Sequence, residues 1–166
     1  MTVVSTARDP ESRTFTVTSE FDADPHQIWE LWQDPGLLEK WWGPPGYPAT
    51  FSRHELSPGG TVAYFMTGPE GDRHHGWWRI VSLDPPSRLE FEDGFADDDG
   101  RPDPSMPTTT VRVSIERDAE RGVGRMLIES TYGSVEEMDE VLEMGMEQGI
   151  TAALNQIDGL LRGPAG

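Results

Sequence analysis

Hydrophobic and polar residues alternate along most of the middle of the chain. Between Arg13 and Glu20, Phe15 and Val17 fall on one face and threonines on the other, a pattern typical of a strand that buries one face. The alternation recurs, between turns rich in glycine and proline, over residues 49–56, 61–67, 76–83, 88–93, 108–117 and 125–132. Because no helix intervenes between these later segments, the pattern predicts an antiparallel meander in a sheet of about seven strands.

Two short helices are expected between the first strand and the meander. Asp24 precedes Pro25 and an apolar stripe, which predicts a capped helix that ends before the next proline. A second short helix is expected from Gly36 to about Trp41.

The segment from Val135 to about Leu161 carries the clearest helical pattern. Ser134 and Glu137 form a capping box, and apolar residues recur at three- and four-residue steps opposite an acidic face. The apolar positions are Val135, Met138, Leu142, Met146, Ile150, Ala153, Leu154, Ile157 and Leu161. The pattern predicts one continuous helix that lies across the sheet.

Composition narrows the classes of function. The 166 residues include 13 basic and 30 acidic ones, a net charge of −17 that opposes binding to nucleic acid or to anionic membranes. The absence of cysteine excludes disulfides and thiolate chemistry. No apolar run has the length of a signal peptide or a membrane span, so we expect a cytoplasmic protein. We expect a flexible N-terminus at residues 1–12 and a single domain over residues 13–162.

Two adjacent tryptophans, Trp41 and Trp42, precede the rigid sequence GPPG. Proline and glycine end the preceding helix there and hold a turn. Because adjacent side chains diverge in a helix or a strand, we expect one indole in the core and the other at the rim of a cavity. The alternative is that both indoles fill one end of the core.

A family resemblance is carried by the order of the elements and by four stretches: DPHQIWELWQDPGLLEKWWGPPG, ELSPGGTVAYFMTGPEG, HGWWRIVSLDPPSRLEF and GMEQGITAALNQIDGLL. From about Phe15 to Leu161 the chain resembles the START-like (SRPBCC, helix-grip) superfamily and, more narrowly, the homologues of the activator of heat-shock protein 90 ATPase. The resemblance implies an α+β helix-grip fold, with a curved antiparallel sheet around a long C-terminal helix. It also implies a cavity between helix and sheet, where many members bind apolar small molecules in a functionally diverse family. Ser57 departs from the pattern, since a basic residue commonly stands there.

The face of the last helix that is expected to lie inward carries small residues. Gly145 and Gly149 each cost about 1 kcal/mol of helix propensity relative to alanine. Either the helix approaches the sheet closely there, or the missing side chains leave volume for a ligand. Ile150 stands where the family commonly has tryptophan, which leaves further room.

Candidate catalytic and metal-binding groups are few. The four histidines have no convincing partner, and His74 and His75 are expected to be exposed at a hairpin. The acidic segment EDGFADDDGRPDPSM fails the calcium-loop pattern because Phe95 and Met106 occupy the first and twelfth positions. We interpret it as a solvated loop, and the functional alternative is that Phe95 and Met106 fold over a cavity mouth as a lid. We predict no catalytic residue, metal or cofactor.

The leading hypothesis is a binding protein, rather than an enzyme, that encloses an apolar or aromatic small molecule between the sheet and the C-terminal helix. The alternatives are an enzyme of the cyclase, hydrolase or dehydratase type that uses the same cavity, and a co-chaperone of heat-shock protein 90. The residues expected to contact the ligand are Trp42, Tyr64, Met66, Trp78, Phe91, Phe95, Met106, Met138, Met146 and Ile150. Methionines suit an adaptable pocket wall and are equally typical of plain core. The sequence permits a homodimer.

Overall fold

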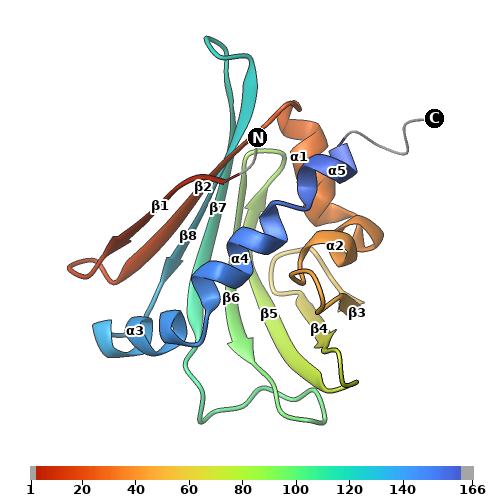
Figure 1. The fold of residues 1–166 in the computed structure, drawn as a ribbon, viewed down its shortest axis with the longest axis vertical. Coiled ribbons are helices and arrows are strands. Elements are labelled where there is room, and N and C mark those ends of the chain that lie inside the picture. Colours follow the sequence, from red (N-terminus) through yellow and green to blue (C-terminus); the bar gives the residue numbers. More distant parts are fainter. Residues whose placement is uncertain (1–2, 162–166) are drawn as a thin grey trace.

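The architecture is a curved antiparallel sheet with helices laid over one face (Figure 1). The computed structural model describes residues 3–161. Eight strands form a single sheet in the order β1-β2-β8-β7-β6-β5-β4-β3. The strands are β1 (Val3–Asp9), β2 (Thr14–Phe21), β3 (Ala49–His54), β4 (Thr61–Thr67), β5 (Arg73–Asp84), β6 (Arg88–Phe95), β7 (Thr109–Asp118) and β8 (Val123–Thr131). All seven predicted strands are confirmed, and the helix-grip fold class with them.

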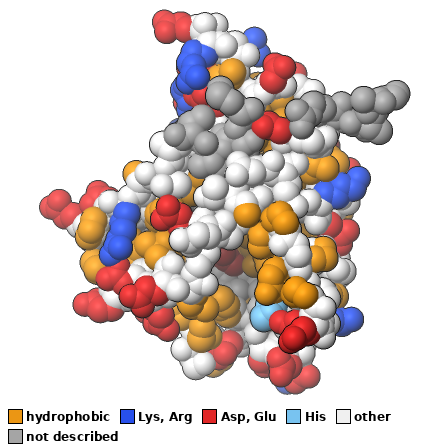
Figure 2. Space-filling view, in the orientation of Figure 1, with side chains coloured by type: hydrophobic (Ala, Val, Ile, Leu, Met, Phe, Trp, Pro, Cys, Tyr) orange, Lys and Arg blue, Asp and Glu red, His pale blue; other side chains and the backbone are white. Residues whose placement is uncertain are grey.

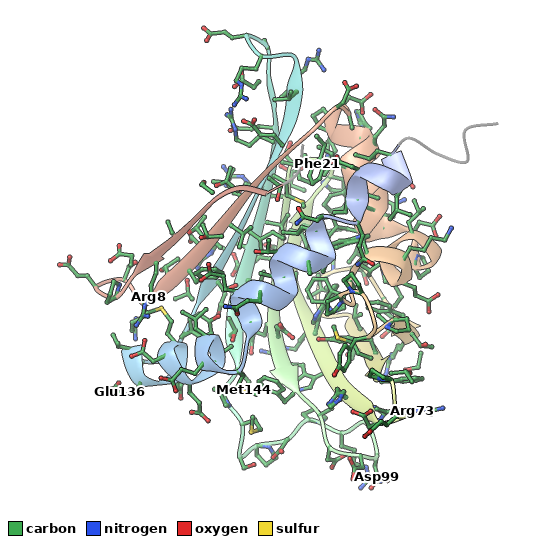
Figure 3. The ribbon with its side chains drawn as sticks, in the orientation of Figure 1. Arg8, Phe21, Arg73, Asp99, Glu136 and Met144 are labelled. Atoms are coloured by element: carbon green, nitrogen blue, oxygen red, sulfur yellow. The ribbon has the colours of Figure 1, made fainter. Side chains whose placement is uncertain are left out.

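The additional strand, β1, lies in the segment expected to be a flexible N-terminus, so that expectation does not hold for residues 3–9. β1 pairs antiparallel with β2 at the edge of the sheet. From Ser5 to Asp9 its side chains are exposed, and they carry no alternation that would have revealed a strand. Backbone pairing holds the strand, and Arg8 adds an ion pair with Asp139 on the first of the C-terminal helices (Figure 3).

The two helices after β2 are present as predicted. Helix α1 (Pro25–Gln33) begins at a capping box formed by Asp24 and Gln27, and α2 (Pro35–Trp41) begins directly after it. The Asp34 side chain accepts the backbone N–H of Gly36, which satisfies one free donor at the start of α2. Both helices bury leucine and tryptophan against the sheet.

The prediction of one continuous C-terminal helix is wrong. The segment forms α3 (Val135–Glu143), α4 (Met146–Leu154) and α5 (Ile157–Leu161). The first break occurs because Gly145 has φ +93°, a left-handed conformation that ends a helix and that glycine adopts without strain. Helix α4 crosses the face of the sheet diagonally, and α3 turns toward the edge formed by β1 and β2 (Figure 1).

At the second break, between α4 and α5, side-chain hydrogen bonds join the C-terminal segment to the backbone around Trp41 and Trp42. The side-chain amide of Gln156 donates to the backbone carbonyls of Gly43 at 2.8 Å and Trp41 at 3.3 Å. Trp41 itself is fully buried, and its indole N–H donates to the carbonyl of Leu31 at 2.9 Å. The expectation that at least one of the two tryptophans is buried in the core is therefore confirmed.

The core lies between the sheet and the helices and is rich in aromatic rings. Trp32, Trp41 and Trp78 are fully buried, and the rings of Trp78 and Phe91 stack with centroids 4.3 Å apart.

In the described part of the chain, no helix is long and apolar enough to cross a membrane.

Candidate functional site

A partly enclosed cavity of about 290 Å³ lies between the sheet and the junction of α3 and α4. Its sheet side is formed by Tyr64, Met66, His74, His75, Gly76, Asp93, Gly94, Phe95, Thr109 and Ser130, with Tyr132 just after β8. Its helix side is formed by Val141, Met144, Gly145 and Met146. The break in the C-terminal helix thus lies over the cavity rather than remote from it.

The surface around this region is largely apolar. Hydrophobic side chains gather in the lower half of the face shown in Figure 2, with acidic side chains around the periphery. Met144, at the junction of α3 and α4 in Figure 3, is 57% exposed although it lines the cavity. An exposed methionine at this place provides an apolar and adaptable edge to the opening.

The most unusual group in the cavity wall is the carboxyl of Asp93. Strand alternation places Asp93 on the same face as Phe91 and Phe95, and it is paired in register with Trp78 on one side and Thr109 on the other. Burial raises the pKa of Asp93 from 3.8 to about 7, an effect that the Gly94 backbone N–H partly offsets. This carboxyl therefore gains and loses its proton near neutral pH.

Two tyrosines line the cavity together with Asp93. Burial, and next the negative charge of Asp93, raise the pKa of Tyr132 to about 12 and raise the pKa of Tyr64 further. Both phenols therefore stay protonated at physiological pH. Tyr132 is 2% exposed, and its hydroxyl has no hydrogen-bond partner among the described residues. Such a buried and unsatisfied hydroxyl is available to a ligand.

Tyr64 is positioned by the residues around its ring. A side chain at Gly76 would lie 2.4 Å from the Tyr64 hydroxyl oxygen, so the missing Cβ makes room for the phenol. The indole N–H groups of Trp42 and Trp78 act on the phenol in the direction that lowers its pKa. Neither of them meets the geometry of a full hydrogen bond with any described group. Two buried donors thus surround the phenol at the inner end of the cavity.

Of the ten residues predicted from the sequence to contact a ligand, four line this cavity: Tyr64, Met66, Phe95 and Met146. They come from strands β4 and β6 and from the start of α4. Because the three elements are far apart in sequence, the fold rather than any local motif brings these side chains together.

Three predicted residues form a second layer behind the wall. The Trp42 ring lies edge-on to Tyr64 at 6.0 Å and to Trp78 at 4.8 Å, and Trp78 stacks on Phe91. Trp42 is half-buried and supports the wall formed by Tyr64, whereas we expected it at the mouth.

The remaining predicted residues lie elsewhere. Met138 is fully buried in the core, and Ile150 packs against the core without lining the cavity. Met106 lines a separate depression with Trp77 and Pro102, so the structure does not place it over the cavity. A Cβ at Gly149 would have no neighbour within 4 Å, so of the two alternatives for this glycine the close approach to the sheet is not found.

The two histidines expected to be merely exposed both border the cavity. His74 is exposed, and its Nε2 lies 2.6 Å from an Asp72 carboxylate oxygen, while His75 is half-buried. The acidic loop is held by its own turn, in which Asp97 accepts the backbone N–H groups of Asp99 and Arg101. Within residues 3–161, no group of three or more histidine, aspartate or glutamate side chains is arranged to hold a metal ion.

Asp93 was not among the residues predicted from the sequence, although the strand pattern around it carries a signal. Positions 89, 91, 93 and 95 alternate as Leu, Phe, Asp and Phe, so an acidic residue occupies an inward position of a strand. Because charged residues are almost never fully buried without a partner, this position marks a candidate site.

Comparison with known proteins places these features in a family. The model of the family described as Activator of Hsp90 ATPase homolog 1-like protein matches residues 22–162. A solution structure of a protein from Arthrobacter aurescens is 46% identical, with a TM-score of 0.92 over 99% of this chain and 95% of that one. Protein Ms6760 from Mycobacterium smegmatis is 43% identical, with a TM-score of 0.88 over 96% of each chain.

The fold is also shared by solved structures of lower sequence identity. CalU16 from Micromonospora echinospora is 18% identical, with a TM-score of 0.59 over 96% of this chain and 83% of that one. None of the curated proteins matches the chain.

Proposed function

The chain belongs to the family of Activator of Hsp90 ATPase homolog 1-like proteins, and on that premise we propose that it binds an apolar or aromatic small molecule under the α3–α4 junction. The observation that carries the proposal is the cavity itself, whose wall combines apolar side chains with the half-buried carboxyl of Asp93. Small-molecule sites typically have this composition, in which apolar walls supply contact area and a few polar groups fix orientation.

The size of the cavity sets the size of the ligand. About 290 Å³ is at the lower end of the range of roughly 300–1,000 Å³ for small-molecule sites. A ligand of one or two rings fits this volume. Met66, Met144 and Met146 supply side chains that adapt to rings of different shape.

An enzyme that uses the same cavity is the second candidate, and Asp93 is the observation that favours it. A carboxyl with a pKa of about 7 both accepts and donates a proton readily at neutral pH, as general acid–base catalysis requires. Tyr64 and Tyr132 beside it are neutral hydroxyl donors that suit a developing negative charge on oxygen. Both candidates use the same ligand position, so binding is the property to test first.

The binding proposal is tested with the uncharged fluorescent dye N-phenylnaphthylamine. The protein should enhance and saturate its fluorescence, and Val141→Trp, which fills the helix side of the cavity, should abolish the saturable signal. Val81→Trp is the matched control, because Val81 is 43% exposed on β5 and does not line the cavity. Absence of dye binding by the unmodified protein, or equal binding by both variants, would contradict the proposal.

A further inference from the structure

Among the described residues, no lysine or arginine pairs with the Asp93 carboxyl. The lining of the cavity contains no lysine or arginine, and within residues 3–161 no ion pair includes Asp93. Glu20, which is 2% exposed, offers the contrast, since it lies 2.6 Å from a nitrogen of Arg121 and 3.0 Å from one of Arg125. The protein therefore compensates the buried carboxylate of Glu20 internally and leaves the half-buried carboxyl of Asp93 uncompensated in the wall of a cavity.

An uncompensated carboxylate of this kind is costly unless a cation arrives from outside. Removing an ionised carboxylate from water is unfavourable, and the penalty is recovered only when a charge of opposite sign and further hydrogen bonds are supplied. We propose that the cavity selects small aromatic or aliphatic molecules that carry a protonated amine, with the Asp93 carboxylate as its counter-ion. This inference rests on the small-molecule binding proposed above.

The groups beside Asp93 suit an ammonium head. The Tyr132 hydroxyl, buried and without a partner among the described residues, can accept one of its N–H groups, and the neighbouring Ser130 can accept another. The ring faces of Tyr64 and Phe95 add attraction between a cation and an aromatic quadrupole. The three donors of an ammonium group thus have acceptors within one cavity.

The charge of the whole molecule acts in the same direction. With a net charge of −17, the protein attracts cations and repels anions over several ångströms. A ligand with a carboxylate or phosphate would place a second negative charge beside Asp93 with no lysine or arginine in the lining to offset it. The cavity therefore discriminates against anions as well as in favour of amines.

The dependence of binding on pH has a definite sign. An ammonium binds the ionised carboxylate, so its affinity should rise as the pH increases through the pKa of Asp93, about 7, and level off above it. A neutral carbonyl ligand would instead use the protonated carboxyl as a donor, and its affinity would fall over the same range. The other titratable groups that line the cavity are Tyr64, His74, His75 and Tyr132, while α3 and α4 contribute none.

The test compares three probes that share one ring system: naphthylethylamine, ethylnaphthalene and naphthylacetate. Each is titrated calorimetrically, or by displacement of N-phenylnaphthylamine, at about pH 8 and about pH 5.5, on either side of the pKa of Asp93. At the higher pH the amine should bind about tenfold to a hundredfold more tightly than the hydrocarbon, as expected of a buried charge-assisted contact. The carboxylate should bind more weakly than the hydrocarbon.

Asp93→Asn should remove the preference for the amine and most of the dependence of amine binding on pH. Asp84→Asn is the matched control, since it deletes the same charge at an exposed site at the far end of β5. If Asp93→Asn does not fold, Asp93→Glu provides the second variant, and it should retain the preference for the amine.

Four results would overturn the inference. They are equal affinity for amine and hydrocarbon at about pH 8, an unchanged preference for the amine in Asp93→Asn, tighter binding of the carboxylate than of the hydrocarbon, and an affinity for the amine that falls as the pH rises from about 5.5 to about 8. Failure of all three probes, including the hydrocarbon, would remove the proposed function as well, which distinguishes the two failures.

Discussion

Replacing Asp93 by asparagine should make the folded protein progressively more stable than the wild type as the pH rises from about 4 to about 7. The perturbation removes a carboxyl whose pKa is raised from 3.8 to about 7 by burial. Because the unfolded chain releases this proton at lower pH than the folded one does, the unfolded state binds fewer protons between these two values. The stability of the wild type therefore includes a contribution that is complete below about pH 4 and is lost as the pH rises through about 7.

The size of the effect follows from the same two values. Each tenfold change in a proton-binding constant corresponds to about 1.4 kcal/mol, so a change from 3.8 to about 7 amounts to about 4 kcal/mol. The difference in unfolding free energy between Asp93→Asn and wild type should grow by up to this amount across the interval and stay constant above it. A poorly hydrogen-bonded asparagine amide would lower the stability of Asp93→Asn by the same amount at every pH. The dependence of the stability difference on pH would not change.

The assay is equilibrium unfolding in urea at a series of pH values, with wild type, Asp93→Asn and Asp84→Asn measured in parallel. Carboxylates other than Asp93 contribute equally to wild type and variant, so their difference isolates this one group. Asp84→Asn controls for the loss of one negative charge from a chain with a net charge of −17. A difference between wild type and Asp93→Asn that does not change with pH, or that matches the Asp84→Asn difference, would refute the account of Asp93 as an uncompensated carboxyl with a raised pKa.

Four other variants test local features, three of them by thermal or urea unfolding and Gly76→Ala by dye binding. Gly145→Ala should destabilise the folded protein by about 1–2 kcal/mol, because Gly145 has φ +93°. Gly149→Ala should stabilise it by up to about 1 kcal/mol, because Gly149 is in a helix and an added Cβ has no neighbour within 4 Å. Effects of the same sign in both variants would contradict the helix break at Gly145. Gln156→Ala should lower the free energy of unfolding by about 1–2 kcal/mol, because its hydrogen bonds to the carbonyls of Trp41 and Gly43 are lost. An unchanged unfolding midpoint would show that these bonds do not stabilise the fold. Gly76→Ala should displace the Tyr64 ring and lower dye affinity; unaltered dye affinity would argue against the phenol as part of the site.

The sheet was predictable from the sequence because its signals are local. Alternating faces such as Phe15 and Val17, with glycine and proline turns between them, placed seven of the eight strands. Strand β1 was missed because an edge strand with exposed side chains has no hydrophobic period, and its pairing with β2 is a long-range property of the backbone.

The break at Gly145 was missed for a different reason. A glycine within an apolar helical period has the same sequence signature whether it is helical or left-handed, and the period continues across Met144 and Met146. Only packing against the rest of the protein selects one of the two conformations. The cavity depends on the left-handed conformation of Gly145, because Met144, Gly145 and Met146 line it.

The candidate site was only partly predictable. Aromatic and methionine residues were selected by size and by resemblance, which cannot separate a cavity wall such as Tyr64 from the layer behind it, such as Trp78. Asp93 was recoverable as an acidic residue at an inward strand position, but Ser130 and Tyr132, which line the cavity with it, lie at and just after the end of β8, two positions away from β6 in the sheet. Their proximity follows from strand order, which the sequence does not display.

The central claim, that a small molecule occupies the space under the α3–α4 junction, is tested most directly by NMR of methionine methyl groups. Met66, Met144 and Met146 line the cavity, whereas Met126 and Met138 are fully buried in the core. On titration with naphthylethylamine at about pH 8, where Asp93 is ionised, the account predicts saturable shifts of the three cavity methyls and none of the two core methyls. Shifts that spare Met66, Met144 and Met146, or no shift at any methionine, would contradict it.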